Sequence, residues 1–586
     1  MNKTELIRKV KEMKDITSDE RAYLLDLINT KKKYGLVWED KPEDVEEQLR
    51  RELPVFKEIK DRAIMSEDVE APNHILIEGD NLHALTALTF THKDKIDVIY
   101  IDPPYNTGNK DFIYNDKYVD REDSYRHSKW LSFMEKRLRL AHELLNETGV
   151  IFLSIDDNEN AQLKLLCDEI FNSKNFIRDI IWQSRKSVSN DAFISMNHNY
   201  TLFYAKNSQV LDKNNFKLPI NASNFSNVDN DPRGKWKADP FDAPGIRPNL
   251  TYAIKNPNTG QEYWPPKGRC WRVAESDYLE FLKDNRILFG KTGRSKPQLK
   301  RFLDFATNKG ATAISVWNDI DTTTNGTKQL MEVLNNNMFN NPKPLGLLRR
   351  ILQLSTSNNK SALVLDFFAG SGTTLHSTLE LNKEDDGKRQ CILVTNNENN
   401  IAEEVTYERN KRVIEGYKNL KGEEVEGLTA NNLRYFQTDF VPSVSNEKNR
   451  RLLTERSTEL ICIKEDCYID ITAQHKNIQP HLSRIFTNQK GNYLVVIYHS
   501  FVQFEVIQEL IKIIPTLGTD EKVKVYSFSP EKETIDEEFL PIIDMIDSVP
   551  LPESIYNTYK QCFKSIKLDR KPVVEPEKTD DNVLFI

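Results

Sequence analysis

The strongest constraint on the fold is an alternation of short apolar runs with segments of helical spacing, which occurs twice in the chain. In the first half the apolar runs are HILIEGDN (74–81), DVIYIDPPYN (97–106) and GVIFLSIDD (149–157), each ending in polar or turn-forming residues. In the second half they are SALVLDFFAGSGTT (361–374) and RQCILVTNNEN (389–399). Such runs, separated by helices, are typical of a mostly parallel sheet covered by helices on both faces. The pattern predicts a doubly wound α/β fold.

Regions of different character interrupt and flank this alternation. Residues 208–330 are rich in Asn, Pro and Gly and show no clean succession of strands and helices. The N-terminal segments 4–13, 19–35 and 42–59 have apolar residues at three- and four-residue spacing, which predicts helices. We therefore expect five parts: an N-terminal helical region (1–66), a first half of the α/β domain (67–207), an insert (208–330), a second half (331–430) and a C-terminal α+β interaction domain (431–586).

The C-terminal part is acidic and has no motif that indicates chemistry. LICIKE (460–465), YLVVIY (493–498) and VKVYSF (523–528) are short apolar runs, and we expect them to be strands. EVIQELIKII (505–514) has the spacing of an amphipathic helix. This part and the N-terminal helices are candidates for contacts with a second copy or a partner, and ordinary packing is the alternative.

Composition excludes several classes of protein. With 38% hydrophobic and 29% charged residues, the 586-residue chain has the balance of an ordinary globular protein. We expect no membrane span, because no apolar run approaches about 18 to 20 residues. The charged start lacks the apolar stretch of a signal peptide, which favours the cytoplasm. The six cysteines are scattered without metal-site spacing, so we expect reduced structural thiols and no metal.

Asp102, Pro103, Pro104 and Tyr105 directly follow the apolar run VIYI. The carboxyl end of a strand in an open parallel sheet is where ligands bind, so Asp102 should be displayed there. Two consecutive prolines stiffen the turn and leave its carbonyls free to accept hydrogen bonds. A carboxylate and a carbonyl beside an aromatic ring suit an exocyclic amine on a planar base. A proline-rich surface turn is the alternative, and the surrounding strand and NTG turn favour the functional interpretation.

A second motif, DFFAGSGTT (366–374), follows the strand candidate ALVL. Closely spaced glycines let backbone amides approach a ligand at a strand-to-helix turn. The motif is neither GxxxxGK[ST] nor GxGxxG, so a pyrophosphate is not the expected ligand. An acidic residue and two phenylalanines ahead of the glycines suit a cationic amino-acid tail and an adenine ring. Glu398, after the next strand candidate, could hold ribose hydroxyls, or it could be an ordinary loop residue.

The two motifs together closely resemble the signature pair of the amino-methyltransferases of DNA, D-P-P-Y and D-x-F-x-G-x-G. Here the DPPY motif comes first, an order similar to the beta group of these enzymes. Longer phrases resemble the modification subunits of type III restriction–modification systems over about residues 73–440. They are LIEGDNLHAL (76–85), IDPPYNTGNKDFIYND (101–116), WPPKGRCWR (264–272), NPKPLGLLRRIL (341–352) and LDFFAGSGTT (365–374).

The resemblance implies a circularly permuted methyltransferase fold that uses S-adenosylmethionine. It assigns the amino group and flipped base to Asp102, Pro103, Pro104 and Tyr105. Lys343 and Pro344 match a family position near the methionine end of the cofactor. Asp80 could reach the cofactor's adenine end or simply cap the helix that follows it. The cofactor pocket would be lined by Asp80, Asp366, Phe368, Gly370, Gly372, Thr373 and Glu398.

The insert supplies positive charge that the chain as a whole, at net −8, lacks. Residues 232–301 contain 15 Lys or Arg and seven Asp or Glu. Basic residues bind phosphates, and Arg and aromatic side chains contact bases, so this composition favours DNA recognition. A basic surface around a small aromatic core is the alternative. The interleaved aromatic residues are Trp236, Tyr252, Tyr263, Trp264, Trp271 and Phe289.

We therefore expect a base-flipping adenine-N6 methyltransferase acting on double-stranded DNA. Asp at the head of the motif favours adenine over cytosine N4, which stays open as a second possibility. An enzyme acting on an RNA or protein amino group, a stand-alone adenine methyltransferase and a non-catalytic specificity scaffold stay open as well. The chain has no GxxxxGK[ST] loop, so an ATP-driven motor is excluded and the resemblance implies a separate restriction subunit. It also implies a homodimer.

Overall fold

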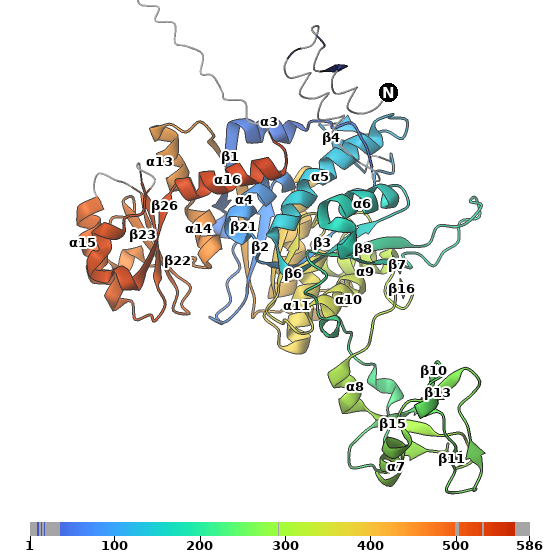
Figure 1. The fold of residues 1–586 in the computed structure, drawn as a ribbon. Coiled ribbons are helices and arrows are strands. Elements are labelled where there is room, and N and C mark those ends of the chain that lie inside the picture. Colours follow the sequence, from blue (N-terminus) through green and yellow to red (C-terminus); the bar gives the residue numbers. More distant parts are fainter. Residues whose placement is uncertain are drawn as a thin grey trace, which may run out of the picture. The chain divides into compact units, whose positions relative to one another are not determined.

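The computed structural model describes residues 36–568, apart from 110, 116, 291, 499–502 and 530–532, together with residues 9–10, 13 and 17 (Figure 1). The helices predicted at 4–13 and 19–35 therefore lie largely outside the described residues. The chain divides into two compact units. The first comprises residues 1–211, 315–348 and 360–586, and the second comprises residues 212–314 and 349–359.

The first unit is built on a ten-stranded sheet with the strand order β1-β21-β2-β18-β17-β3-β6-β8-β7-β16. The six consecutive strands from β21 to β6 are parallel to one another. β1 runs antiparallel to β21, and β8 runs antiparallel to both β6 and β7. In sheet order the strands are β1 (Glu52–Glu58), β21 (Asn432–Pro442), β2 (Asn73–Glu78), β18 (Gln390–Thr395), β17 (Leu363–Asp366), β3 (Ile96–Ile101), β6 (Leu145–Ile155), β8 (Asn199–Ala205), β7 (Phe176–Trp182) and β16 (Val316–Trp317).

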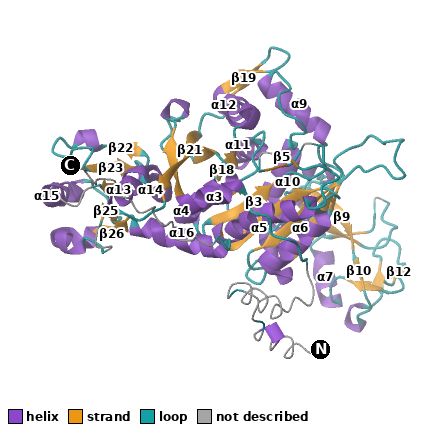
Figure 2. Ribbon diagram, turned by 90° about the horizontal axis from the view of Figure 1, so that it is seen from above, coloured by secondary structure: helices purple, strands orange, loops and turns teal. Residues whose placement is uncertain are grey.

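Helices cover this sheet in two layers (Figure 2). One layer has α4 (Asn81–His92) at its centre, packed against α5 (Arg126–Leu144) and against α14 and α16 from the C-terminal region. The other contains α9 (Thr323–Leu334), α11 (Thr373–Asp385) and α12 (Glu408–Glu415), which contact one another. Strands covered on both faces carry consecutive apolar residues, such as residues 75–77 of β2 and residues 98–101 of β3. The predicted mostly parallel α/β fold is confirmed.

The remaining helices of the first unit are α3 (Asp44–Arg51), α6 (Asn160–Cys167) and α10 (Leu345–Thr356), the last of which continues into the second unit. The C-terminal region adds a five-stranded sheet in the order β22-β23-β24-β25-β26, buried on an apolar core of its own. Its strands are β22 (Ile469–Asp470), β23 (Ser483–Thr487), β24 (Tyr493–Ile497), β25 (Val523–Phe528) and β26 (Ile546–Leu551). Its helices are α13 (Glu447–Arg456), α14 (Thr458–Glu465), α15 (Gln503–Ile513) and α16 (Glu553–Ser565).

Three expectations about elements were wrong. LICIKE is part of α14 rather than a strand, because its apolar residues pack against α4 and β24. A short apolar run cannot by itself distinguish a strand from a buried helix. The helix predicted at 42–59 ends at Arg51, and 52–58 form β1, whose apolar residues are buried against β21. The third concerns the boundaries: β1 from the N-terminal region and β21 from the C-terminal region are the first two strands of the central sheet, so neither residue 66 nor residue 431 separates a part of the chain from that sheet.

The second unit has a small aromatic core made by Phe241, Ile254, Trp271, Tyr278, Ile287 and Phe289. Its elements are a three-stranded sheet in the order β14-β15-β9, two two-stranded antiparallel sheets (β10-β13 and β11-β12) and two helices. The expected insert extended to residue 330, but β16 and α9 belong to the first unit, since β16 pairs with β7. The elements are β9 (Trp236–Pro240), β10 (Asp242–Pro244), β11 (Ile254–Lys255), β12 (Glu262–Tyr263), β13 (Arg269–Trp271), α7 (Glu275–Lys283), β14 (Ile287–Leu288), β15 (Gln298–Phe302) and α8 (Leu303–Lys309).

All six cysteines are buried free thiols. Among the described residues, no helix combines the length and the apolar character that crossing a membrane requires.

Candidate active site

The register of the central sheet brings the two sequence motifs together. β17 pairs in parallel with β3, with Val364 opposite Val98 and Leu365 opposite Ile99. The DPPY turn after β3 and the glycine loop after β17 therefore leave the sheet at the same edge. Asp80 follows β2 and Glu398 follows β18 at that edge as well. Ligands bind at this edge in open α/β sheets.

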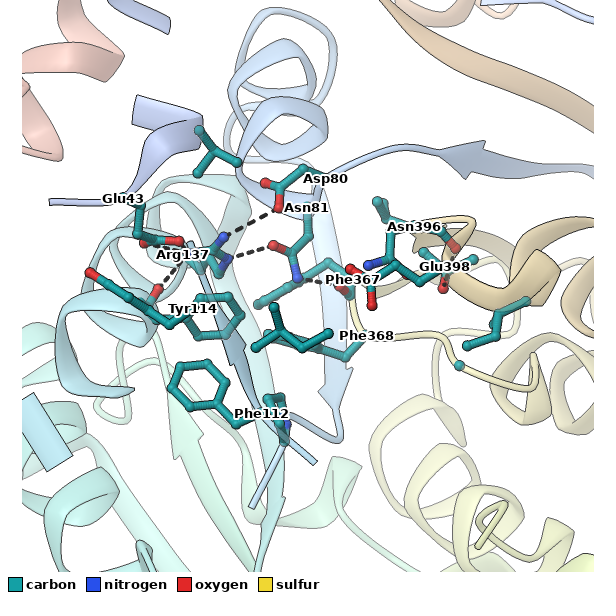
Figure 3. Close-up of a pocket in the computed structure, with 18 of the residues that line it drawn as sticks. Glu43, Asp80, Asn81, Phe112, Tyr114, Arg137, Phe367, Phe368, Asn396 and Glu398 are labelled. Atoms are coloured by element: carbon teal, nitrogen blue, oxygen red, sulfur yellow. Dashed lines mark hydrogen bonds and ion pairs between the residues drawn. The ribbon is translucent and has the colours of Figure 1, made fainter. Parts of the chain in front are cut away.

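A cavity of about 450 Å³ opens at this edge (Figure 3). Of the predicted site residues, six line the cavity: Asp80, Asp102, Pro104, Phe368, Gly370 and Glu398. The other five, Pro103, Tyr105, Asp366, Gly372 and Thr373, lie outside its lining. Each motif thus provides some residues that face the cavity and others that support them.

Asp102 has a protein donor on each carboxylate oxygen. The Tyr105 hydroxyl donates to Oδ1 at 2.9 Å, and Lys343 Nζ donates to Oδ2 at 2.5 Å. Lys343 Nζ also lies 5.0 Å from the centre of the Tyr105 ring. Burial, followed by the charge of Asp102, raises the pKa of Tyr105 well above its ordinary value, so this hydroxyl remains a donor. Tyr105 orients Asp102 as well as flanking the cavity.

The rest of the DPPY turn is held from α5. Trp130 Nε1 donates a hydrogen bond to the carbonyl of Pro104 at 2.7 Å, and the Trp130 side chain is fully buried. This bond occupies one of the two proline carbonyls that were expected to be free. Pro103 is buried, and its missing N–H cannot compete for the neighbouring acceptors. The turn is therefore stiff on the side opposite the cavity.

Asp366 closes the glycine loop and does not line the cavity. Its Oδ1 accepts the N–H of Phe368 at 3.0 Å, and its Oδ2 accepts the Thr374 hydroxyl at 2.5 Å. Burial raises the pKa of Asp366 to about 7, against the lowering effect of these two donors. The expectation that Asp366 faces a cationic cofactor tail must be corrected, because its oxygens are turned into the loop. These two hydrogen bonds fix the conformation of the loop.

The loop backbone requires glycine at two positions. Gly370 has φ +48° and Gly372 has φ +71°, values that other residues adopt at a cost. A Cβ on Gly370 would lie 3.0 Å from the Phe339 ring, and one on Gly372 would lie 2.3 Å from Asn410 Nδ2. Gly370 thus presents bare backbone to the cavity while its other side is packed.

Thr373 begins α11 behind the loop. Its hydroxyl donates to the carbonyl of Lys343 at 3.2 Å and accepts from Arg409 Nη1 at 2.7 Å. Arg409 is fully buried, and burial lowers its pKa to about 10, so it remains charged at neutral pH. Thr373 therefore links the glycine loop to the segment that holds Lys343, and it has no direct access to the cavity.

Aromatic rings form one wall of the cavity. Phe368 lies 5.9 Å from Phe133 of α5, and Phe133 lies 5.2 Å from Phe112, measured between ring centres. The Phe112 and Phe133 rings meet edge to face and the Phe133 and Phe368 rings are tilted, so together they give an apolar wall against which a planar ring can pack. Phe112 and Phe133 were not predicted, because they lie in segments whose spacing indicated only core packing.

A polar part of the cavity lies beside these aromatic rings and was missed by the sequence interpretation. Arg137 is fully buried on α5 and lies over the Phe133 ring. It donates to Oε1 of Glu43 at 2.9 Å and to Oδ1 of Asn81 at 2.5 Å, and its Nη2 lies 3.5 Å from Asp80 Oδ2 (Figure 3). An arginine among the apolar residues of WLSFMEKRLRLAHELL was the available signal, since a charged residue on a buried helix face needs a partner.

Asp80 has two roles in this network. Its Oδ1 accepts the N–H of Leu82 at 2.7 Å, so it is the N-cap of α4, and it also lines the cavity. The capping alternative and the cavity position are therefore compatible. The next residue, Asn81, donates to the carbonyl of Phe367 at 3.0 Å and so ties α4 to the glycine motif.

Comparisons with known proteins agree with this geometry. Residues 96–419 match the family model described as DNA methylase. The chain is 37% identical over 366 residues to the StyLTI Mod subunit of a type III restriction-modification enzyme from Salmonella typhimurium, covering 57% of this chain and 55% of that protein. It is 33% identical over 367 residues to the type II methyltransferase M.KpnI of Klebsiella pneumoniae, covering 57% and 84% respectively.

The chain spans only about half the length of the StyLTI subunit. Among solved structures, a putative DNA modification methylase from Thermus thermophilus, complexed with S-adenosyl-L-methionine, is 14% identical and aligns over 58% of this chain and 92% of that one. The TM-score of 0.29 is too low to support an inference.

Proposed function

Because the chain belongs to the DNA methylase family, we propose that it transfers a methyl group from S-adenosylmethionine to adenine N6 in double-stranded DNA. We further propose that it is the modification and specificity subunit of a type III restriction–modification system. The principal support is one relationship in the sheet. Asp102 and Gly370 come from distant motifs, follow neighbouring parallel strands and line one cavity.

The cavity suits the proposed cofactor. Phe368 and Phe133 would contact the adenine ring, and the carboxylates of Asp80 and Glu398 are acceptors suited to hydroxyl groups. The exposed backbone at Gly370 would permit close approach of the amino-acid part of the cofactor. When bound, S-adenosylmethionine supplies a methyl group on a sulfonium, which is already an activated leaving group. Asp366 would act only by holding the loop.

Asp102 is the proposed catalytic residue. The lone pair of adenine N6 is delocalised into the ring, so this nitrogen is a poor nucleophile. A carboxylate oxygen that accepts an N6–H, together with the Pro103 carbonyl, would localise the lone pair toward the methyl group. Tyr105 orients the carboxylate through its 2.9 Å hydrogen bond. This is electrostatic preorganisation and positioning, without a covalent enzyme intermediate.

The base must leave the duplex to reach Asp102, because N6 is inaccessible within the stacked helix. Stacking beside Tyr105 would hold the flipped base. The second unit is the proposed target-recognition domain, since it contains most of the basic and aromatic residues identified between 232 and 301. We also propose that the protein works in the cytoplasm as a homodimer and binds a separate restriction subunit. This part of the proposal rests on the similarity to Mod subunits.

The test is to express the chain in a host that lacks adenine methylation and to sequence its DNA by a long-read method that detects modified bases. The expected result is N6-methyladenine at one recurring sequence. A matched strain expressing the Asp102→Ala variant should show none. Modified cytosine would favour the N4 alternative, and unmodified DNA despite soluble, cofactor-binding protein would reject methylation of DNA.

Product analysis with tritiated cofactor would complete this test in vitro. Purified protein, duplex DNA containing the mapped sequence, RNA and a protein extract would be compared as methyl acceptors. Incorporation into DNA alone, recovered as N6-methyladenine after digestion, is expected. Adding a co-expressed candidate restriction subunit and measuring its co-purification would test the proposed partnership separately.

A further inference from the structure

The ammonium group of Lys343 lies where the target amino group is expected. Its Nζ donates to Asp102 Oδ2 at 2.5 Å and lies 5.0 Å from the centre of the Tyr105 ring. The side chains of Lys343 and Asp102 are 11% and 26% exposed, so the pair is largely shielded from water. An N–H donor on the carboxylate, beside the aromatic ring, is the arrangement proposed for adenine N6.

The backbone around Lys343 is firmly held. Its carbonyl accepts the Thr373 hydroxyl at 3.2 Å, and the N–H of Leu345 donates to Gln329 Oε1 at 3.0 Å. At Gly326 on α9, a Cβ would lie only 2.3 Å from the Pro342 carbonyl oxygen, so this segment packs closely on α9. Only the long side chain is therefore free to change position, and a lysine has enough rotatable bonds to do so.

An ammonium at this position would oppose methyl transfer. Asp102 Oδ1 accepts from Tyr105 and Oδ2 accepts from Lys343, so an incoming amino group would have to share an oxygen with one of these donors or displace Lys343. The nitrogen that gains a methyl group becomes positively charged as the bond forms. A second full positive charge a few ångströms away in a poorly hydrated site would oppose that charge. A cation near an aromatic face is also a competitor for stacking on that face.

We propose that Lys343 is a latch that occupies the place of the target amino group until a base displaces it. The proposal rests on the proposed function, because it assumes that Asp102 binds the amino group. Lys343 is then a positioning residue that keeps Asp102 and Tyr105 in the reactive arrangement while the pocket is empty. It also selects for bases able to replace both of its contacts, a hydrogen bond to the carboxylate and a stack beside Tyr105.

The latch differs from the role suggested by family position, in which Lys343 lies near the methionine end of the cofactor. The Lys343→Met variant separates the two, since it keeps the length of the side chain and removes the charge. If Lys343 is a latch, the base enters more easily and cofactor affinity does not change. If Lys343 holds the cofactor, cofactor affinity falls.

The probe is duplex DNA containing the mapped sequence with the target adenine intact and 2-aminopurine as its neighbour. The fluorescence of 2-aminopurine rises when the adjacent target adenine leaves the stack, so it reports entry of that adenine into the pocket. Lys343→Met should raise the flipped fraction and lower KM for DNA by about fivefold, the scale of one partly buried ion pair. Cofactor Kd from titration calorimetry should stay within about twofold of wild type. Lys343→Arg, which keeps the charge, should not raise the flipped fraction as Lys343→Met does.

Lys328→Met is the matched control, because Lys328 is an exposed lysine on the neighbouring α9. It should leave flipping, KM and cofactor Kd unchanged. The latch is wrong if Lys343→Met weakens cofactor binding tenfold, or if it lowers kcat without changing the flipped fraction. If the wild-type enzyme is active and Lys343→Met has the same flipped fraction and the same KM for DNA, the latch is rejected and the proposed function is unaffected.

A second measurement does not depend on the variant folding well. In a structure of the wild-type protein with cofactor and target duplex, Lys343 Nζ should have left Asp102, and the base should have replaced it. If a base is bound in the pocket while Nζ still contacts Asp102, Lys343 is not a latch. If no wild-type protein methylates DNA at all, the proposed function fails first, and this is seen before any variant is made.

Discussion

Arg137 Nη1 lies 2.9 Å from Glu43 Oε1 at the polar end of the cavity, with the arginine side chain fully buried and the glutamate 7% exposed. Glu43 is the residue before α3, and Arg137 lies on α5, so the pair joins the N-terminal region to the α/β domain. Burial raises the pKa of Glu43, while the charge of Arg137 and its hydrogen bond lower it. The pair therefore depends on both partners remaining in place.

Glu43→Gln should destabilise the protein, because it leaves the buried Arg137 with only the more distant carboxylate of Asp80 at 3.5 Å. Removing one partner of a buried ion pair costs about 3–5 kcal/mol in the free energy of unfolding. Urea denaturation followed by circular dichroism would measure the loss. Cofactor affinity should fall as well, since Arg137 also positions Asn81 and, through it, the Phe367 carbonyl.

Glu47→Gln is the control for this prediction. Glu47 lies on the same helix and pairs with Arg50 at 3.0 Å, but it is 54% exposed. Exposed pairs contribute at most about 1 kcal/mol, so the unfolding midpoint should scarcely change. Equal losses in the two variants would contradict the structural role given to Arg137.

Asp102→Ala should abolish methyl transfer while cofactor binding survives. The carboxylate is the proposed acceptor for the amino group, and removing one preorganised electrostatic group costs about 10²- to 10³-fold in rate. The Tyr105 hydroxyl and Lys343 would lose their shared acceptor. Tritium incorporation into DNA and titration calorimetry with the cofactor would be measured on the same preparation. Undiminished turnover would reject the assignment of Asp102.

Glu159 should make the stability of the protein depend on pH. Its side chain is fully buried, accepts a hydrogen bond from Asn106 at 2.5 Å and is hydrogen-bonded to His127 Nδ1 at 2.7 Å. Burial raises its pKa to about 8, from an ordinary value of 4.5. Folded protein therefore holds the proton more tightly than unfolded protein, so this contribution is complete below about pH 4.5 and declines as pH rises to about 8.

Glu159→Gln should flatten that decline by a few kcal/mol across the same range, on the order of 1.4 kcal/mol per unit of pKa shift. Unfolding midpoints in urea at several pH values would give the slope for each protein. The variant Glu122→Gln changes an exposed glutamate and should keep the wild-type slope. Parallel curves for wild type and Glu159→Gln would show that Glu159 is ionised at neutral pH.

The basic face of the second unit should bind DNA phosphates. It consists of Lys237, Arg272, Arg286, Arg301 and Lys309, next to Phe305, which is 65% exposed. Three of these cations share the carboxylate of Asp239 at 3.5–3.8 Å, so positive charge is left over. A variant with Arg272, Arg301 and Lys309 changed to Ala should bind DNA more weakly and retain cofactor affinity.

Salt dependence is the sharper readout for this face. Removing one cation that binds a phosphate should reduce the slope of log affinity against log salt concentration by about 1. Fluorescence anisotropy with labelled duplex would be measured at several salt concentrations. Changing Lys421, Lys476 and Lys522 to Ala removes the same charge from exposed positions of the first unit. If both triple variants lose affinity equally, net charge rather than this face accounts for binding.

The strands of the central sheet and both motifs were predictable because their signals are local. A buried parallel strand is apolar over consecutive residues, as in β2 and β3, and the residues after it occupy a known edge of the sheet. These grounds placed Asp102 and Glu398 at that end of the sheet, and the family resemblance assigned Phe368 and Gly370 to the cofactor pocket. Asp366 was identified as a site residue, but only the structure shows that its oxygens face into the loop.

Several features could not be predicted, because they are stabilised by contacts between segments that are distant in the sequence. LICIKE is helical since it is covered by α4, and 52–58 form a strand since β21 supplies the hydrogen-bonding partner. Glu43 meets Arg137 and Lys343 meets Asp102 only after the sheet has assembled. The amino-acid sequence determined the local elements, the loop chemistry and the family. The tertiary structure decided which charged groups face one another, because burial of a charge depends on partners that local spacing does not encode.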